Sequence, residues 1–125
     1  MKKVFFALCV LFACKGEAQK TVLAPAEFQR TVSETQGAIV LDVRTPEEIA
    51  TGRIANAQSI VYDDGFDQKL GTLENKPIFI YCASGKRSAK AAKILRDRGY
   101  KNVYELEGGL NAWKASGLPV SNANP

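Results

Sequence analysis

One cysteine, Cys82, directly follows the strongest strand signal of the chain, residues 78–81, and precedes an amphipathic run that begins at Ser88. The loop between them is therefore expected where a strand ends and the N-terminus of a helix begins. Lys86 and Arg87 in the same loop, together with the helix dipole, favour the thiolate form of the cysteine. The sequence predicts an activated thiol nucleophile at Cys82.

The loop that follows this cysteine is also suited to binding an anion. Gly85 permits a tight turn with a positive φ, and successive backbone N–H groups of such a turn converge on one point. Arg87 offers a planar fork to oxygen atoms, and Lys86 a second positive charge. The residues expected to bind substrate are Ala83, Ser84, Gly85, Lys86 and Arg87, which we call the anion cradle.

The sequence contains no histidine. This excludes Ser-His-Asp hydrolases, Cys-His proteases and His-ligated zinc enzymes, so any chemistry must use other groups. No cofactor and no metal site is predicted. Asp42 and Arg44, at the end of another apolar run, are interpreted as structural residues that fix loops by hydrogen bonds, and Trp113 as a core residue.

Short apolar runs alternate with helical patterns along the chain, which favours βα units and a parallel sheet. Strands are expected at residues 21–23, 38–41, 59–62, 78–81 and 103–106. Helices are expected at residues 26–34, from Thr45 to Gly52, within 63–71, at 88–98 and at 109–115. The run 38–41 is apolar throughout, as in a strand buried on both faces.

At 125 residues, with 46% hydrophobic and 24% charged, the chain has the length and composition of one globular domain. Residues 1–18 are expected to be a secretory signal, because a basic head precedes ten apolar residues, too few to span a bilayer. Cleavage is expected after Ala18, or before a Cys14 that is then acylated. Either leaves a domain at 20–120, a frayed tail at 121–125, and a periplasmic or lipid-anchored protein.

Either cleavage lowers the formal net charge from +4 to +2 and leaves Cys82 as the only thiol of the domain. A nearly balanced charge gives no support for nucleic-acid binding, and membrane contact is expected only through a lipid on Cys14. A single thiol cannot form a disulfide within the domain. It is therefore either buried and inert or reactive.

Three motifs in this order resemble the rhodanese family of sulfurtransferases, in its small single-domain form. Residues 81–88 resemble the catalytic loop, residues 41–48 with 52–54 the first signature, and residues 107–120 the C-terminal signature. Arg53 and Ala55 depart from the family, which commonly has histidine and proline there. The resemblance implies a three-layer α/β/α fold around a mainly parallel five-stranded sheet. It also implies that Cys82 passes sulfane sulfur, as a persulfide, from thiosulfate or a similar anionic donor to a thiol or cyanide.

Two other functions remain open. A phosphatase or arsenate reductase of the same fold would also use a cysteine and an arginine in one loop, but such enzymes typically have a longer spacing than the four residues between Cys82 and Arg87. A non-catalytic binding module is the second alternative. Such modules usually lack the cysteine, which this chain retains.

Overall fold

The structure, a computed structural model, describes residues 20–122. In chain order its elements are β1 (Val22–Leu23), α2 (Pro25–Glu34), β2 (Ile39–Asp42), α3 (Pro46–Ile49), β3 (Gln58–Ser59), the 3₁₀ helix η2 (Asp67–Thr72), β4 (Ile78–Tyr81), α4 (Lys86–Asp97), β5 (Val103–Leu106) and α5 (Gly109–Ala115). The expected signal segment and Cys14 lie outside the described residues. Within residues 20–122, none of the helices has the length and apolar character needed to cross a membrane.

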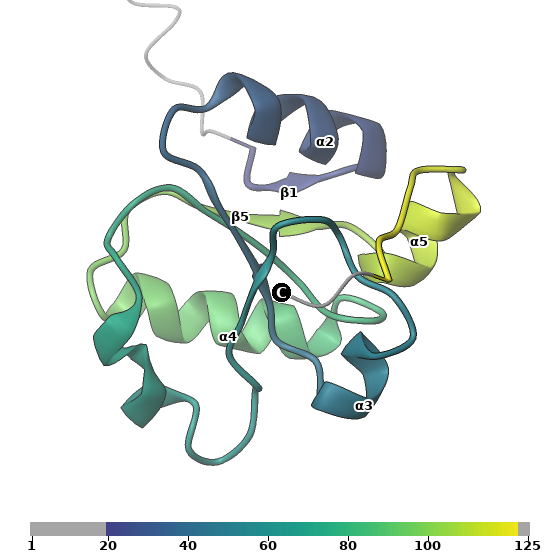
Figure 1. Cartoon of the computed structure of the whole chain (residues 1–125). Helices are drawn as coiled ribbons and strands as arrows, with labels where there is room; N and C mark the ends of the chain where they lie inside the picture. Colours follow the sequence, from purple (N-terminus) through teal and green to yellow (C-terminus); the bar gives the residue numbers. More distant parts are fainter. Residues whose placement is uncertain (1–19, 123–125) are drawn as a thin grey trace, which may run out of the picture.

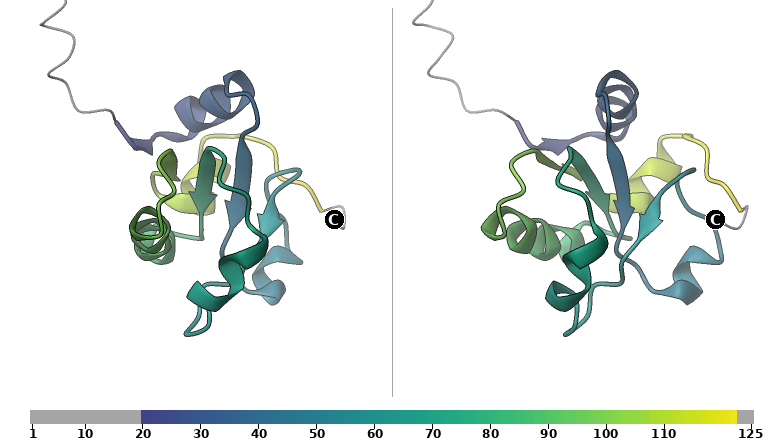
Figure 2. Two further views of the ribbon diagram at one scale, coloured as in Figure 1. Left: turned by 90° about the vertical axis from the view of Figure 1, so that its left-hand side faces the viewer. Right: turned by 60° about the vertical axis from the view of Figure 1, so that its left-hand side comes forward.

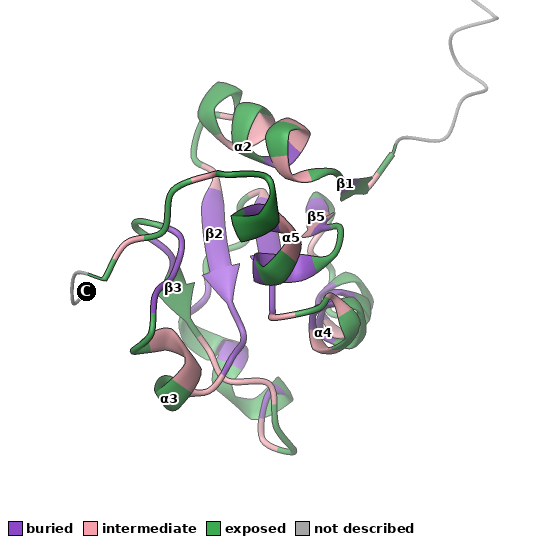
Figure 3. Ribbon diagram, turned by 90° about the vertical axis from the view of Figure 1, so that its right-hand side faces the viewer, coloured by how far each residue is buried: buried purple, intermediate pink, exposed green. Residues whose placement is uncertain are grey.

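The five strands form one sheet in the order β1-β5-β4-β2-β3, and every pair is parallel. Figures 1 and 2 show α2 and α5 on one side of this sheet and α4 on the other. The expected three-layer α/β/α architecture with a five-stranded sheet is confirmed, and the sheet is parallel throughout. All residues of β2 and β4 are buried (Figure 3), in keeping with the apolar sequence of β4 and of β2 up to its last residue, Asp42.

Alternation along β4 divides the core into two halves. Ile78, Ile80 and Cys82 pack in one cluster with the buried faces of α4 and η2, while Phe79 and Tyr81 pack in another with α2 and α5. Successive side chains of a strand point to opposite faces, so the cysteine that follows Tyr81 lies on the α4 side of the sheet. The sheet thus separates the thiol from the α2–α5 core.

Several element boundaries differ from the sequence expectation. The strand expected at 59–62 is only Gln58–Ser59, although the N–H groups of Ile60 and Tyr62 still donate to the carbonyls of Asp42 and Val43 at 3.1 and 2.9 Å. The helix expected within 63–71 is the 3₁₀ helix η2. Helix α4 begins at Lys86, two residues before the expected start, because Gly85 adopts the left-handed conformation and caps it.

The polar segment after Val120 has one ordered attachment. Ser121 forms an isolated antiparallel bridge with Arg53, in which each backbone N–H donates to the other's carbonyl at 2.6 and 3.0 Å. The bridge places the residues after α5 against the loop that follows α3.

Candidate active site

Cys82 follows the last residue of β4, between the strands β5 and β2 that pair with β4 on either side. Its loop leads directly into α4. The carboxyl ends of parallel strands are where ligands bind in open α/β sheets. The structure therefore confirms the expected position of the thiol, between the end of a strand and the N-terminus of a helix.

The Cys82 sulfur accepts two backbone hydrogen bonds from the turn that follows it. The N–H of Gly85 lies 3.1 Å and the N–H of Ser88 3.3 Å from Sγ. Burial raises the pKa of this thiol, but hydrogen bonds from the Ser88 side chain and from the N–H groups of Ser88, Gly85 and Ser84 outweigh it, and the pKa lies below its usual value. The thiolate is therefore favoured without a neighbouring base.

Gly85 provides the turn that makes this arrangement possible. Its φ is +101°, in the region that favours glycine, which confirms the expected positive φ. Within the expected anion cradle, Ser84 and Lys86 are exposed, whereas Ala83, Gly85 and Arg87 are half-buried. Cys82 itself is fully buried beneath them, with 0% of its surface exposed.

Helix α5 holds the loop from the other side. The N–H of Leu110 donates to the carbonyl of Cys82 at 2.8 Å, and the N–H of Asn111 to that of Ala83 at 3.0 Å. This close approach requires a glycine at position 109, since a Cβ there would lie 2.5 Å from the Ala83 carbonyl carbon and oxygen. The first turn of α5 therefore fixes the backbone of the cysteine loop.

Sequence reasoning missed two of these contributors. Gly109 belongs to a motif that the sequence analysis quoted, but nothing local in its sequence indicates that it touches a loop some 27 positions earlier, since the Gly-Gly pair is equally suited to a turn. Ser88 closes the loop motif and begins the expected helix, but the sequence does not predict its contact with the sulfur. Its spacing from Cys82, six residues, places its N–H on the sulfur once the turn at Gly85 is formed.

Arg87 is in contact with a partner from a distant motif. Its two terminal nitrogens donate to the two carboxylate oxygens of Glu48, in α3, at 2.8 and 2.9 Å. Hydrogen bonding from Arg87, opposed by partial burial, lowers the pKa of the Glu48 carboxyl to about 2. The sequence predicts Arg87 as a residue that binds the donor, and no pattern in it indicates this pair.

Asp42, Arg44 and Tyr81 form a buried network beside the site. Arg44 donates to the Asp42 carboxylate at 2.8 Å from Nη2 and to the Gly52 carbonyl at 2.8 Å. The Tyr81 hydroxyl donates to Asp42 at 2.6 Å and accepts from the N–H of Ile54 at 3.0 Å. These bonds tie the ends of β2 and β4 to the chain after α3, which agrees with the structural role expected for Asp42 and Arg44.

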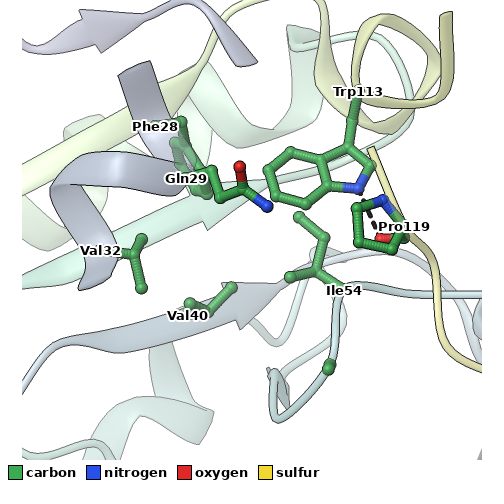
Figure 4. Close-up of a pocket in the computed structure, with 8 residues that line it drawn as sticks. Phe28, Gln29, Val32, Val40, Ile54, Trp113 and Pro119 are labelled. Carbon is green, nitrogen blue, oxygen red and sulfur yellow. Dashed lines mark hydrogen bonds between the residues drawn. The ribbon is translucent and has the colours of Figure 1, made fainter. Parts of the chain in front are cut away.

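A separate apolar pocket lies on the opposite face of the sheet (Figure 4). It has a volume of about 170 Å³, and its lining residues are Phe28, Gln29, Val32, Val40, Ile54, Ala55, Trp113 and Pro119. The indole N–H of Trp113 donates to the Pro119 carbonyl at 2.8 Å, so this side chain is a buried core residue as expected. None of the lining residues belongs to the cysteine loop.

Among residues 20–122 there is also no cluster of three or more acidic, cysteine or histidine side chains that could hold a metal ion.

Comparison with known proteins gives consistent matches. Residues 24–116 match the rhodanese-like domain. A protein named sulfurtransferase from Allochromatium vinosum is 35% identical over 93 residues, which cover 74% of this chain and 87% of that protein. An uncharacterized protein from Synechocystis is 36% identical over 98 residues, 78% of this chain, and the chain spans only 54% of its length.

A solved structure is similar along its full length. The rhodanese-related protein from Thermoplasma volcanium superposes with a TM-score of 0.73 at 31% identity, over 84% of this chain and 100% of that one. The similarity therefore extends over most of the described sheet and its helices, and includes the cysteine loop within the matched range 24–116.

Proposed function

The chain belongs to the rhodanese-like domain family, and from this membership and the geometry of the loop we propose that it is a sulfurtransferase that carries sulfane sulfur on Cys82. The observation that carries the proposal is the environment of the Cys82 Sγ, which accepts hydrogen bonds from the backbone N–H groups of Gly85 and Ser88 inside a tight loop. These donors stabilise a negative charge on sulfur, both in the resting thiolate and in a persulfide.

Thiosulfate is the proposed donor. The Cys82 thiolate attacks the outer sulfur of thiosulfate, a new S–S bond forms to that sulfur, and the S–S bond within the donor breaks with its electron pair leaving on sulfite. Two anions enter and two leave, so no proton or external oxidant is needed. The proposed role of the loop from Ala83 to Arg87 is to hold the donor through its backbone N–H groups, with positive charge from Lys86 and from Arg87 to the extent that the pair with Glu48 leaves it unneutralised.

A thiol or cyanide is the proposed acceptor. Its nucleophilic atom attacks the outer sulfur of the persulfide and regenerates the Cys82 thiolate, which completes a ping-pong cycle. The cycle needs a good leaving thiolate more than it needs a base. This fits a site whose thiol has a lowered pKa and a chain without histidine.

The test is to incubate the mature protein with thiosulfate and to measure the mass of the Cys82 peptide. We expect the addition of one sulfur atom, its removal by cyanide, and the loss of both adduct and transfer in Cys82→Ser with an unchanged circular dichroism spectrum. A serine hydroxyl has nearly the same shape but stays protonated. Failure to form the adduct, together with hydrolysis of an aryl phosphate, would overturn the proposal in favour of a phosphatase.

We further propose that the protein is exported, on the basis of the basic and apolar residues at its N-terminus. Intact-mass analysis of the protein from its native host tests this. Cleavage after Ala18 gives the soluble mature form, whereas a lipid-sized increment on Cys14 gives the anchored form. An unprocessed Met1 would refute both.

A further inference from the structure

The bidentate pair between Glu48 and Arg87 joins α3 to the first turn of α4 at the edge of the cysteine loop. The two side chains are about one-third exposed, 33% for Glu48 and 34% for Arg87. Both side chains are therefore accessible to solvent at the edge of the loop. The pair joins the first signature to the cysteine loop, across 39 residues of sequence.

Glu48 is fixed on its own helix before it contacts Arg87. Its Oε1 accepts the Thr45 N–H at 3.0 Å, and the Thr45 hydroxyl accepts the Glu48 N–H at 3.3 Å, which together form a capping box. Arg44 also donates to the Glu48 carbonyl at 3.4 Å. The carboxylate thus occupies a set position, and Arg87 is the more adaptable partner.

The pair changes what Arg87 can offer to an anion. Both terminal nitrogens already donate to Glu48, so the fork that matches oxyanions is occupied, and the two charges cancel to first order. The pKa of Arg87 is raised chiefly by its hydrogen bond to Glu48, against partial burial, and also by the charge of Cys82. Arg87 belongs to the same loop as Cys82 and interacts with its charge, so neutralising the guanidinium alters the potential at the sulfur.

We propose that Glu48 is a specificity-determining residue, which holds the Arg87 guanidinium in an ion pair and so reduces the preference of the site for doubly charged over singly charged sulfur donors. This proposal rests on the sulfurtransferase function proposed above. Electrostatic attraction scales with donor charge, so a change of one unit at the edge of the loop affects thiosulfate, a dianion, more than a thiosulfonate, a monoanion.

The test compares thiosulfate with benzenethiosulfonate in wild type and in Glu48→Gln. Both donors give up their terminal sulfur in the same way, with sulfite or a sulfinate as the leaving group. The glutamine retains an oxygen for the Thr45 N–H but loses the charge. We expect the ratio of kcat/KM for thiosulfate to that for benzenethiosulfonate to rise about threefold or more. Glu47→Gln, which removes the same charge from an exposed neighbouring position on α3, should leave the ratio unchanged.

A second set of variants separates charge neutralisation from direct donor binding by Arg87. Arg87→Gln leaves Glu48 unpaired and should lower the donor ratio, whereas the double variant Glu48→Gln, Arg87→Gln should return it close to the wild-type value. A double variant that stays as low as Arg87→Gln would show that Arg87 binds the donor directly, and would overturn the proposal.

Other outcomes are equally decisive. If Glu48→Gln lowered kcat/KM equally for both donors, so that their ratio did not change, the pair would only support the fold. That result would refute the role in specificity. If wild type forms no persulfide with either donor, the sulfurtransferase function itself fails, and the specificity proposal falls with it. These two failures are distinguished by the wild-type measurement alone.

Discussion

At the scale of single residues, the chemistry of the thiol depends on backbone N–H groups. Gly85 and Ser88 bring these groups to the Cys82 sulfur, and together with the Ser88 side chain and the N–H of Ser84 they outweigh the effect of burial on its pKa. A chain with no histidine can therefore hold a reactive thiolate. Burial also has a protective effect, because a sulfur with 0% exposure is reached only by small reagents that fit the loop.

Ser88 provides the first prediction, because its side chain contributes to the lowered pKa of Cys82. In Ser88→Ala the backbone N–H remains but the hydroxyl is lost, so the pKa of the thiol should rise. The pH profile of Cys82 alkylation should then move to higher pH, and persulfide formation near neutral pH should slow by a few-fold. Iodoacetamide kinetics across a pH series would measure this shift.

Ser84→Ala is the matched control for this measurement. Ser84 is exposed and affects the thiol through its backbone N–H, which the substitution keeps. Its alkylation profile should follow that of the wild type. Coincident profiles for Ser88→Ala and wild type would mean that the Ser88 hydroxyl does not influence the sulfur.

At the scale of elements, α5 supports the cysteine loop through Gly109. Alanine at this position would combine a left-handed backbone, at φ +63°, with contacts of 2.5 Å to Ala83, so the loop or the helix must shift. We expect Gly109→Ala to cost on the order of 2–4 kcal/mol of unfolding free energy and to reduce sulfur transfer. Urea denaturation and a transfer assay would measure the two effects.

Gly117 is a suitable control, because its φ is also positive, +80°, but no atom lies within 4 Å of its Cβ position. Gly117→Ala should cost about 1 kcal/mol, for the backbone conformation alone. Its transfer activity should be unchanged. Equal losses in both variants would indicate that the contact between Gly109 and the loop has no energetic importance.

The connection between α3 and α4 predicts a dependence of stability on pH. The Glu48 carboxyl has a pKa of about 2 in the folded protein against 4.5 as a reference, mainly because of its hydrogen bonds from Arg87. A lowered pKa stabilises the folded state above the unfolded value, and this stabilisation is lost as the pH falls from about 4.5 to about 2. Urea denaturation over this pH interval should show that the unfolding free energy falls more steeply with decreasing pH in wild type than in Glu48→Gln.

In Glu47→Gln the unfolding free energy should depend on pH as it does in wild type, because Glu47 is exposed on the same helix. The Glu48 contribution is expected to be modest, since the pair is partly open to solvent and screened by it. A Glu48→Gln slope identical to wild type would show that the pair does not survive in solution.

The elements that are local in sequence could be predicted, and the contacts between them could not. The strand at 78–81, the turn at Gly85 and the helix after it follow from apolar runs, a glycine and amphipathic spacing. The pairing of Arg87 with Glu48 depends on how α3 and α4 are placed in space, which no short pattern encodes. The strand expected at 59–62 is only Gln58–Ser59, because beyond Ser59 the segment keeps single hydrogen bonds to the chain of β2 and Val43 rather than a regular ladder, a difference that its apolar sequence does not reveal.

At the scale of the whole molecule, the sheet separates stability on one face from chemistry on the other. Phe28 is fully buried in the α2–α5 core, with edge-to-face contacts to Phe79 and Trp113 at ring-centre distances of 5.6 and 6.2 Å. Phe28→Ala should cost about 3–5 kcal/mol of unfolding free energy. Transfer activity per folded molecule should be retained, because Cys82 lies across the sheet.

Thermal unfolding with activity assayed well below the transition would test this separation. The corresponding change on the thiol's own face, Leu95→Ala, should lower both stability and transfer, since Leu95 packs in the cluster that contains Cys82. If Phe28→Ala reduced the activity of the folded fraction as much as Leu95→Ala, the two faces would have to be treated as one unit.

The strand order has a consequence for how the protein is made. The cysteine loop is synthesised before β5 and α5, yet the carbonyls of Cys82 and Ala83 accept the N–H groups of Leu110 and Asn111. β4 likewise obtains its neighbour β5, and β1 its partner strand, from the same late segment. On the ribosome the sulfur therefore emerges before the parts that enclose it, so Cys82 is more open to oxidation in the nascent chain than in the folded domain.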